Sequence, residues 1–368
     1  MISSFDNKGF ASDDFFRLEQ ERIFSKYWIF VCFKFMVDQP NRFATRDIAG
    51  VPVLVQNIGG EIQAFRNVCA HRQRKLQDED FGTRKMTCKY HGWHYGADGK
   101  LLAVPYNDEY YHLSQEDICK IKLESFRVEI VGEFVFVNLD KDPIAIDKQF
   151  SQEMTDLLKD LSGHFNREML ISKFSFNANW KLVNEVLRDN THIPFLHTRS
   201  LFSQLDHKVD PPPEDHGQRS SRIPDVQEIS GGGLTHIFND DKHPVYADKV
   251  NRWGDVDGYF EWRFFPNLHV VCPRGGYGFS IEYHHPIAPD KTQATVYMMT
   301  AATKANIPAS FLWGQMKGAR VVLDEDYGAL EAVQAVVGQA PGHSVLGGGE
   351  HEMSALRNLI ASLVRGVR

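Results

Sequence analysis

The sequence predicts an α+β protein in which a small all-β domain precedes a larger domain with an antiparallel sheet packed against helices. Its 368 residues are too many for one compact core, which favours two domains. Residues 41–140 contain short strand-like segments separated by turns, whereas the second half combines alternating strand patterns with long helical periods. We therefore expect an N-terminal helical segment at 1–40, the small β domain at 41–148 and the larger domain at 149–368.

Composition excludes several classes of function. Apolar residues make up 42% of the chain and charged residues 24%, as in an ordinary globular protein, and the net charge is −7 without any basic run. Nucleic acids and anionic membranes are therefore poor partners, and no apolar run reaches the length of a membrane span. Five cysteines are an odd and small number for a chain of this length, which argues against a disulfide framework. With no signal peptide visible after Met1, we expect a cytoplasmic protein.

The first elements are a helix and a hairpin. Ser12 can cap a helix that runs to about Lys26. A hairpin with strands at 51–57 and 61–66 follows, since Gly59 and Gly60 lie between two strand-like segments. This hairpin leads directly to the first of two metal-ligand motifs.

The two motifs pair cysteine with histidine. Cys69 and His71 have C-x-H spacing, Cys88 and His91 have C-x-x-H spacing, and a second hairpin with its turn at 97–100 follows. Two sulfur and two nitrogen ligands on loop tips suit either a zinc ion or a [2Fe–2S] cluster with both histidines on one iron. A structural zinc knuckle is the alternative, although it commonly uses C-x-x-C or H-x-x-x-H spacing.

After a linker at 140–147, the larger domain carries a second histidine pair. A helix containing Trp180 leads to His192 and His197, five residues apart, which an ideal helix would splay by about 140°. The two side chains converge only if the helix ends or bulges between them, and Pro194 supplies a reason for a break. The alternative is a buried core histidine next to an exposed one.

The rest of the domain is read as a loop, a sheet and two helices. Residues 206–251 are irregular, and we interpret them as a cover over a pocket or as a disordered insert. A long helix at 308–337 contains an acidic run, Asp324 to Asp326, from which one carboxylate can complete a two-histidine, one-carboxylate iron site. Four strands and a last helix are expected at 259–265, 268–272, 279–284, 294–300 and 353–367.

These motifs together resemble the α subunit of a Rieske non-haem iron oxygenase, over essentially the whole chain. Asn67, Arg72, Tyr90, Gly92 and Trp93 around the first motif also fit the Rieske pattern. The resemblance implies a Rieske [2Fe–2S] domain and a catalytic domain of helix-grip, START-like form. It further implies that the cluster is held by the residues Cys69, His71, Cys88 and His91.

The resemblance also assigns the mononuclear Fe(II) site. It implies His192 and His197 as two ligands, and it places the third as an aspartate five residues before a helical glutamate. Asp326 with Glu331 fits that spacing, and Asp324 is the fallback. An acid three residues before the first histidine, here Asp189, bridges in the family to a cluster histidine of the neighbouring subunit.

The implied function is that of a terminal oxygenase. It takes electrons from NAD(P)H through a flavin reductase, a ferredoxin or both, and uses O2 to mono- or dioxygenate an aromatic or related small substrate. The quaternary unit is commonly a homotrimer, and an accompanying β subunit stays open. The segment 189–197 is similar to vanillate-type O-demethylases, whereas residues 342–359 look more like ring hydroxylases or enzymes acting on quaternary amines. An O- or N-demethylase is therefore the alternative.

Two rivals lie outside this family. An electron-transfer protein without catalysis explains the cluster motif but leaves the second histidine pair unused. A zinc hydrolase would use His192, His197 and an acid.

The sequence does not disclose the substrate, but Leu187, Phe195 and Trp313 are candidates to line its pocket. We expect Arg188 to be a surface residue, although it can attract a carboxylate.

Overall fold

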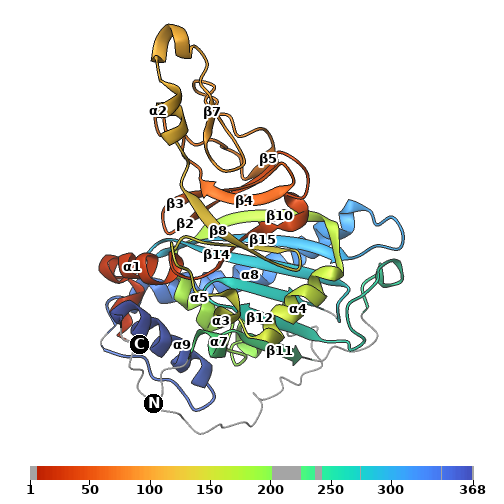
Figure 1. The fold of residues 1–368 in the computed structure, drawn as a ribbon. Helices are drawn as coiled ribbons and strands as arrows, with labels where there is room; N and C mark the ends of the chain where they lie inside the picture. Colours follow the sequence, from red (N-terminus) through yellow and green to blue (C-terminus); the bar gives the residue numbers. More distant parts are fainter. Residues whose placement is uncertain (1–5, 201–224, 237–242, 274, 341, 367–368) are drawn as a thin grey trace. The chain divides into compact units, whose positions relative to one another are not determined.

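The chain divides into two compact units that are described separately. The computed structural model describes residues 6–200, 225–236, 243–273, 275–340 and 342–366. One unit consists of residues 24–146, and the other combines the N-terminal residues up to 23 with residues 147–368. Both contain antiparallel sheets, and helices pack on the sheet of the larger unit, so the predicted α+β class is confirmed (Figure 1).

The smaller unit is built on a seven-stranded antiparallel sheet in the order β1-β9-β8-β4-β3-β2-β5. Its elements are β1 (Ile29–Phe33), β2 (Arg42–Ile48), β3 (Val51–Ile58), β4 (Glu61–Arg66), β5 (Phe81–Thr83), β6 (His94–Tyr95), β7 (Leu101–Ala103), α2 (Gln115–Lys120), β8 (Ser125–Val131) and β9 (Phe134–Asn138). The predicted hairpin forms between β3 and β4, and its turn glycines, Gly59 and Gly60, adopt the positive φ values of 66° and 97° that favour glycine. The second predicted hairpin is the short pair β6 and β7.

The larger unit is built on a six-stranded antiparallel sheet in the order β10-β15-β14-β13-β12-β11. Its strands are β10 (Phe165–Phe176), β11 (Gly231–His236), β12 (Tyr259–Phe264), β13 (Leu268–Cys272), β14 (Gly278–Ala288) and β15 (Lys291–Ala301). Its helices are α1 (Asp13–Glu19), α4 (Gln152–Gly163), α5 (Trp180–Val186), α6 (Ile193–Leu196), α7 (Val226–Ile229), α8 (Ala309–Val337) and α9 (His351–Arg365), and α3 (Ile146–Gln149) lies at the boundary of the two units. The predicted helices at 308–337 and 353–367 therefore form within two residues of their expected starts.

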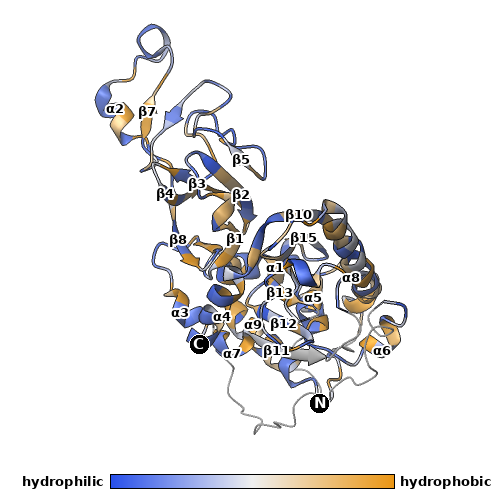
Figure 2. Cartoon of the chain, turned by 90° about the vertical axis from the view of Figure 1, so that its right-hand side faces the viewer, coloured by the Kyte–Doolittle hydropathy of each residue, from blue (hydrophilic) through white to orange (hydrophobic). Residues whose placement is uncertain are grey.

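The long helix α8 is held against the sheet at several points. The Tyr327 ring stacks on Phe176 of β10, with centroids 4.0 Å apart, and its hydroxyl lies 3.0 Å from Nε2 of His284 on β14. One helical turn further, the Glu331 carboxylate accepts a hydrogen bond from the backbone N–H of Asn177 at 2.7 Å. Along its length α8 carries both hydrophobic and hydrophilic residues (Figure 2), as expected for a helix with one buried face. These contacts set the rotation of the helix that carries the acidic run.

A buried charge pair joins the N-terminal helix to α5. Ser12 caps α1 as predicted, but the α-helix ends at Glu19 and a π-helical turn follows. The Glu19 carboxylate is fully buried, and it lies 2.6 Å from the Lys181 ammonium and accepts a hydrogen bond from the Trp180 indole at 3.0 Å. The N-terminal residues thereby become part of the larger unit.

Two sequence expectations differ from the structure. Residues 24–40, which we assigned to the N-terminal segment, lie in the smaller unit, where β1 pairs with β9. The triple glycine at 231–233, expected to be irregular, begins β11, because pairing with β12 overrides the poor strand propensity of glycine. The remainder of the predicted cover over a pocket lies partly outside the described residues. Within the described part of the chain, no helix is long and apolar enough to cross a membrane.

Candidate metal centres

The two cysteine–histidine motifs occupy two loops of the smaller unit. Cys69 and His71 lie in the loop after β4, and Cys88 and His91 lie in the loop before β6. Each loop is closed by backbone hydrogen bonds, from the N–H of Gln73 to the Cys69 carbonyl and from that of Cys88 to the Trp93 carbonyl, as expected where loop tips must hold ligands in place.

Two residues flanking the ligands explain why the loops fold this way. The buried Asn67 amide donates to the Gln77 carbonyl at 2.8 Å, and its oxygen accepts from the backbone N–H groups of Leu76 and Gln77. Gly92 has a φ of 75°, and a Cβ atom there would come within 2.8 Å of the Pro105 ring. Both residues therefore shape the ligand loops without belonging to the ligand set.

The four predicted cluster ligands form two neighbouring pairs, His71 with His91 and Cys69 with Cys88. The rings of His71 and His91 have centroids 4.5 Å apart, and each has a buried Nδ1 without a hydrogen-bond partner. Burial, followed by the charge of His91, lowers the pKa of His71 and so favours the neutral imidazole that binds metals. Cys69 and Cys88 are both buried, and burial raises the pKa of Cys69, with the neighbouring Cys88 adding to the increase. This donor set of two thiols and two unpartnered ring nitrogens fits a [2Fe–2S] cluster.

Three aromatic residues surround these ligands. Trp93 stacks on His71 with centroids 4.7 Å apart and planes within 7° of parallel, and Tyr111 meets the same ring edge-on at 5.3 Å. The Tyr95 oxygen accepts a hydrogen bond from the Ala70 N–H at 3.0 Å and lies 3.2 Å from the Cys69 sulfur. Tyr95 and Tyr111 were not predicted as part of this site, because nothing in their spacing from the motifs marks them.

The hydroxyl of Tyr95 should tune the potential of the cluster. Because the tyrosine oxygen already accepts from Ala70, its proton is free to donate to the Cys69 sulfur, and such donation stabilises the more negative, reduced state. A hydrogen bond worth about 0.5–1.5 kcal/mol, at 59 mV per tenfold for one electron, predicts that Tyr95→Phe lowers the midpoint potential by roughly 20–65 mV. A redox titration followed by the EPR signal of the reduced cluster measures this. Tyr106→Phe, at an exposed tyrosine, is the control, and an equal potential in both variants would contradict the prediction.

The second histidine pair flanks a one-turn helix in the larger unit. Helix α5 ends at Val186, and a new helix, α6, begins after His192 and ends before His197. The two Nε2 atoms come within 3.2 Å of each other. The predicted convergence therefore occurs, but our explanation was wrong: Pro194 lies in the first turn of α6, where its missing N–H costs nothing, and it breaks no helix.

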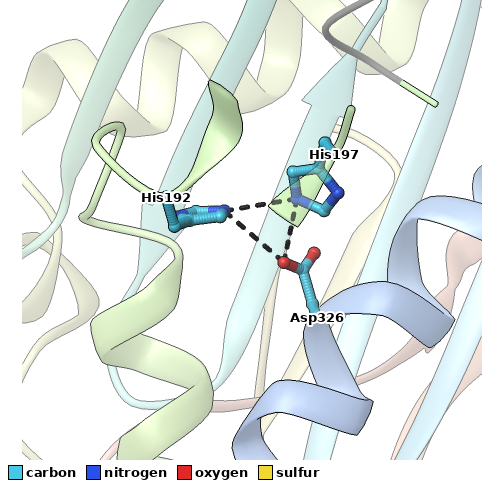
Figure 3. Close-up of side chains that lie close together, drawn as sticks. All are labelled: His192, His197 and Asp326. Carbon is cyan, nitrogen blue, oxygen red and sulfur yellow. Dashed lines mark hydrogen bonds and ion pairs between the residues drawn. The ribbon is translucent and has the colours of Figure 1, made fainter. Parts of the chain in front are cut away.

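Asp326 completes the group. Its Oδ1 lies 3.0 Å from Nε2 of His197 and 3.5 Å from Nε2 of His192 (Figure 3). One potential ligand atom from each of the three residues lies within 4.8 Å of the others. Although burial alone would raise it, the pKa of Asp326 is lowered by the two histidines. Two imidazole nitrogens facing a carboxylate oxygen match the donor set of a two-histidine, one-carboxylate iron site.

The neighbouring acids take different places. Asp324, the fallback ligand, lies on the exposed side of α8 and pairs with Arg320 at 2.6 Å. Asp189 lies outside any helix, and its Oδ2 is 3.4 Å from Nδ1 of His192. Burial raises the pKa of Asp189, but the adjacent His192 ring and the hydrogen bonds donated by Thr191 outweigh it and bring the value to about 2. Glu325, which the sequence analysis did not single out, contacts the ring of His197 at 2.7 Å.

Two further predictions concern the residues that line the substrate pocket and the exposure of Arg188. Phe195 is 84% exposed and Trp313 is 64% exposed, so neither side chain is enclosed by the residues that the structure describes. The Arg188 side chain is only 1% exposed, and it donates hydrogen bonds to the carbonyls of Asn184 and Ile229, so the expectation of a surface residue was wrong. Its guanidinium supports the chain around α5 and α7.

Two family models match the chain. The Rieske [2Fe-2S] domain matches residues 27–145, and the vanillate O-demethylase oxygenase C-terminal domain matches residues 176–365. These ranges fall on the two units that carry the two ligand groups.

Curated relatives and solved structures point the same way. The chain is 29% identical over 315 residues to the large oxygenase component of a naphthalene 1,2-dioxygenase system from Pseudomonas aeruginosa, which covers 78% of this chain and 69% of that protein. It is 29% identical to the chloroplastic choline monooxygenase of Spinacia oleracea, over 71% of this chain and 58% of that one. A quaternary ammonium Rieske monooxygenase has a similar fold, with a TM-score of 0.76 at 19% identity over 98% of this chain and 95% of that chain.

Proposed function

The chain belongs to the Rieske non-haem iron oxygenases, and from that premise we propose that it hydroxylates an aromatic or related small organic substrate. As a member it is a terminal oxygenase that contains a Rieske [2Fe–2S] cluster and a mononuclear iron and draws its electrons from a donor protein. The observation that carries the assignment of the active site is the convergence of His192, His197 and Asp326.

We assign each metal group to one unit. The unit of residues 24–146 would hold the [2Fe–2S] cluster through Cys69, His71, Cys88 and His91, and the larger unit would hold Fe(II) through the residues His192, His197 and Asp326. When bound, the cluster supplies single electrons and the iron supplies the activation of O2. With three side-chain ligands, the iron would keep other coordination positions for substrate and dioxygen.

The surrounding residues have supporting tasks. Asp189 contacts Nδ1 of His192, and in the family's arrangement it would face a cluster histidine of the neighbouring subunit. Trp93 and Tyr111 pack against one cluster histidine, His71, and hold the orientation of its ring. The ring of Tyr327 and its hydrogen bond to His284 set the position of Asp326, its neighbour on α8.

Partners and location follow from the same premise. We propose a homotrimer that receives electrons from NAD(P)H through a flavin reductase, directly or by way of a ferredoxin. The five cysteines form no disulfide, which supports a cytoplasmic location. The order of electron carriers can be tested by reconstitution with each carrier alone and with both.

Hydroxylation is favoured over demethylation by the relatives. The curated relatives include naphthalene, anthranilate and toluate dioxygenases and a choline monooxygenase. The demethylase alternative rests on the segment 189–197 and on the name of the C-terminal family model, which alone do not outweigh those relatives.

The products formed with labelled oxygen test the proposal. Purified protein with a reductase and ¹⁸O2 would be offered naphthalene, benzoate-type acids, choline-type amines and aryl methyl ethers, and the products analysed by mass spectrometry. We expect one or two labelled oxygens in a hydroxylated product. Formaldehyde released with loss of a methyl group would establish demethylation instead, and reduction and reoxidation of the cluster without any product would contradict an oxygenase role.

A further inference from the structure

The two ring nitrogens of His197 face two consecutive residues of α8. Its Nε2 lies 3.0 Å from the Asp326 carboxylate and 3.2 Å from Nε2 of His192. Its Nδ1, on the other side of the ring, lies 2.7 Å from Oε2 of Glu325. The His197 side chain is only 1% exposed, so this contact is shielded from competition by water.

Glu325 is itself held in place. The Ser200 hydroxyl, three residues after His197, donates a hydrogen bond to the same Oε2 atom. The carboxylate therefore accepts from a histidine and a serine on one segment, and it ties the chain after α6 to α8. Its side chain is 23% exposed, and the exposed part leaves room for replacement without overpacking.

We propose that Glu325 is a positioning residue for the metal ligand His197. A carboxylate only accepts hydrogen bonds when ionised, so it draws the single proton of a neutral imidazole to Nδ1 and leaves the Nε2 lone pair facing Asp326 and His192. This inference rests on the proposed assignment of His192, His197 and Asp326 as iron ligands. Partners of this kind commonly hold ligand orientation and affinity in metal sites.

A carboxylate lies behind each of the two histidines, but only the one behind His197 is hydrogen-bonded to the ring. His192 has the carboxylate of Asp189 3.4 Å from its Nδ1, and His197 has that of Glu325 at 2.7 Å. Each imidazole thus has a carboxylate near its Nδ1 atom, and both Nε2 atoms face Oδ1 of Asp326. Loss of Glu325 would free the ring of His197 to rotate or to change tautomer.

Fe(II) binding measures this role without depending on turnover. Protein with its cluster in place and its mononuclear site stripped would be titrated anaerobically with Fe(II). We expect Glu325→Ala to weaken binding by roughly 10–100-fold. Glu325→Gln should weaken it less, because an amide oxygen still accepts from Nδ1–H, and Ser200→Ala should weaken it least.

A spectroscopic readout separates positioning from general damage. The EPR signal of the Fe(II)–nitric oxide adduct should change its rhombicity in Glu325→Ala, since the signal follows ligand orientation. Asp324→Asn is the matched control, since Asp324 lies on the same helix turn. Asp324 pairs with Arg320 and not with a histidine of the site, so the Fe(II) affinity and the spectrum of this variant should equal those of the wild type.

The possible outcomes distinguish the positioning role of Glu325 from the assignment of the iron ligands. If Glu325→Ala binds Fe(II) as tightly as the wild type and His197→Ala does not, the positioning role is overturned while the iron site stands. If His197→Ala also binds like the wild type, the iron site itself is wrong. Should Glu325→Ala fail to fold, Glu325→Gln and Ser200→Ala carry the same comparison.

Discussion

Replacing Asp326 with alanine should abolish turnover while the [2Fe–2S] cluster stays intact. The Asp326 Oδ1 atom faces both histidine Nε2 atoms at 3.0 and 3.5 Å, so its removal takes away one of the three proposed ligands. Loss of a residue that only supports a ligand costs roughly 10–100-fold, and loss of the ligand itself should cost more than about 100-fold in turnover. Product formation measures the effect, and the visible absorbance of the cluster should not change.

Asp324→Asn is the control for this prediction. Asp324 lies two residues before Asp326, but it pairs with Arg320 on the exposed side of α8, so its replacement should leave turnover and iron content close to wild type. If Asp324→Asn loses iron and Asp326→Ala keeps it, the fallback ligand was the correct one. If the chain forms the proposed trimer and the cluster of one subunit serves the iron of the next, mixtures of Asp326→Ala and Cys69→Ser chains should regain part of the activity.

The cluster motif was the most predictable part of the molecule, because its ligands are local in sequence. Cys69 and His71 belong to one loop and Cys88 and His91 to another, so spacing alone limits the chemistry they can share. Helix α8 was also predictable from its apolar period. The choice of Asp326 over its neighbours needed the family's spacing to Glu331, and that glutamate proves to anchor the helix to Asn177.

What the sequence did not disclose depends on tertiary contacts. The run of glycines at 231–233 becomes a strand only because β12 pairs with it. Arg188 is buried because the carbonyls of Asn184 and Ile229, from two separate helical segments, receive its guanidinium. Glu325 adjoins the predicted ligand, yet its task follows from the direction of the helix and the position of His197. No local sequence pattern indicates any of these three features.

A second set of buried charges escaped the sequence analysis because its members are spread over three strands. His269 on β13 lies with Nδ1 3.0 Å from Glu282 on β14 and with Nε2 3.3 Å from Glu261 on β12. All three side chains are at most 10% exposed. Glu282 also accepts from the Ser280 hydroxyl, and Glu261 also pairs with Arg263 at 3.2 Å. The His269 ring therefore lies buried between two carboxylates, which favour its charged form.

Replacing His269 with leucine should destabilise the larger unit severely. Removing one partner of a buried charge group costs about 3–5 kcal/mol, because the remaining charges lose their compensation. For a unit of this size that loss lowers Tm by roughly 6–20 °C, measured by a thermal scan at fixed rate. The double variant His269→Leu with Glu282→Leu should recover part of the loss, since it removes one of the stranded carboxylates.

The pH dependence of this destabilisation tests the charge of His269 directly. Burial lowers its pKa, but the charges and hydrogen bonds of Glu282 and Glu261 outweigh burial and raise the value to about 9. The stabilisation from the charged ring is thus complete below its ordinary pKa of 6.5 and is lost as the pH rises through 9. The difference in Tm between wild type and His269→Leu should be largest at or below pH 6.5 and should shrink toward pH 10. A difference that stays constant over this range would mean that His269 is neutral in the folded protein, in which case the two carboxylates must share a proton or draw compensation from Arg263.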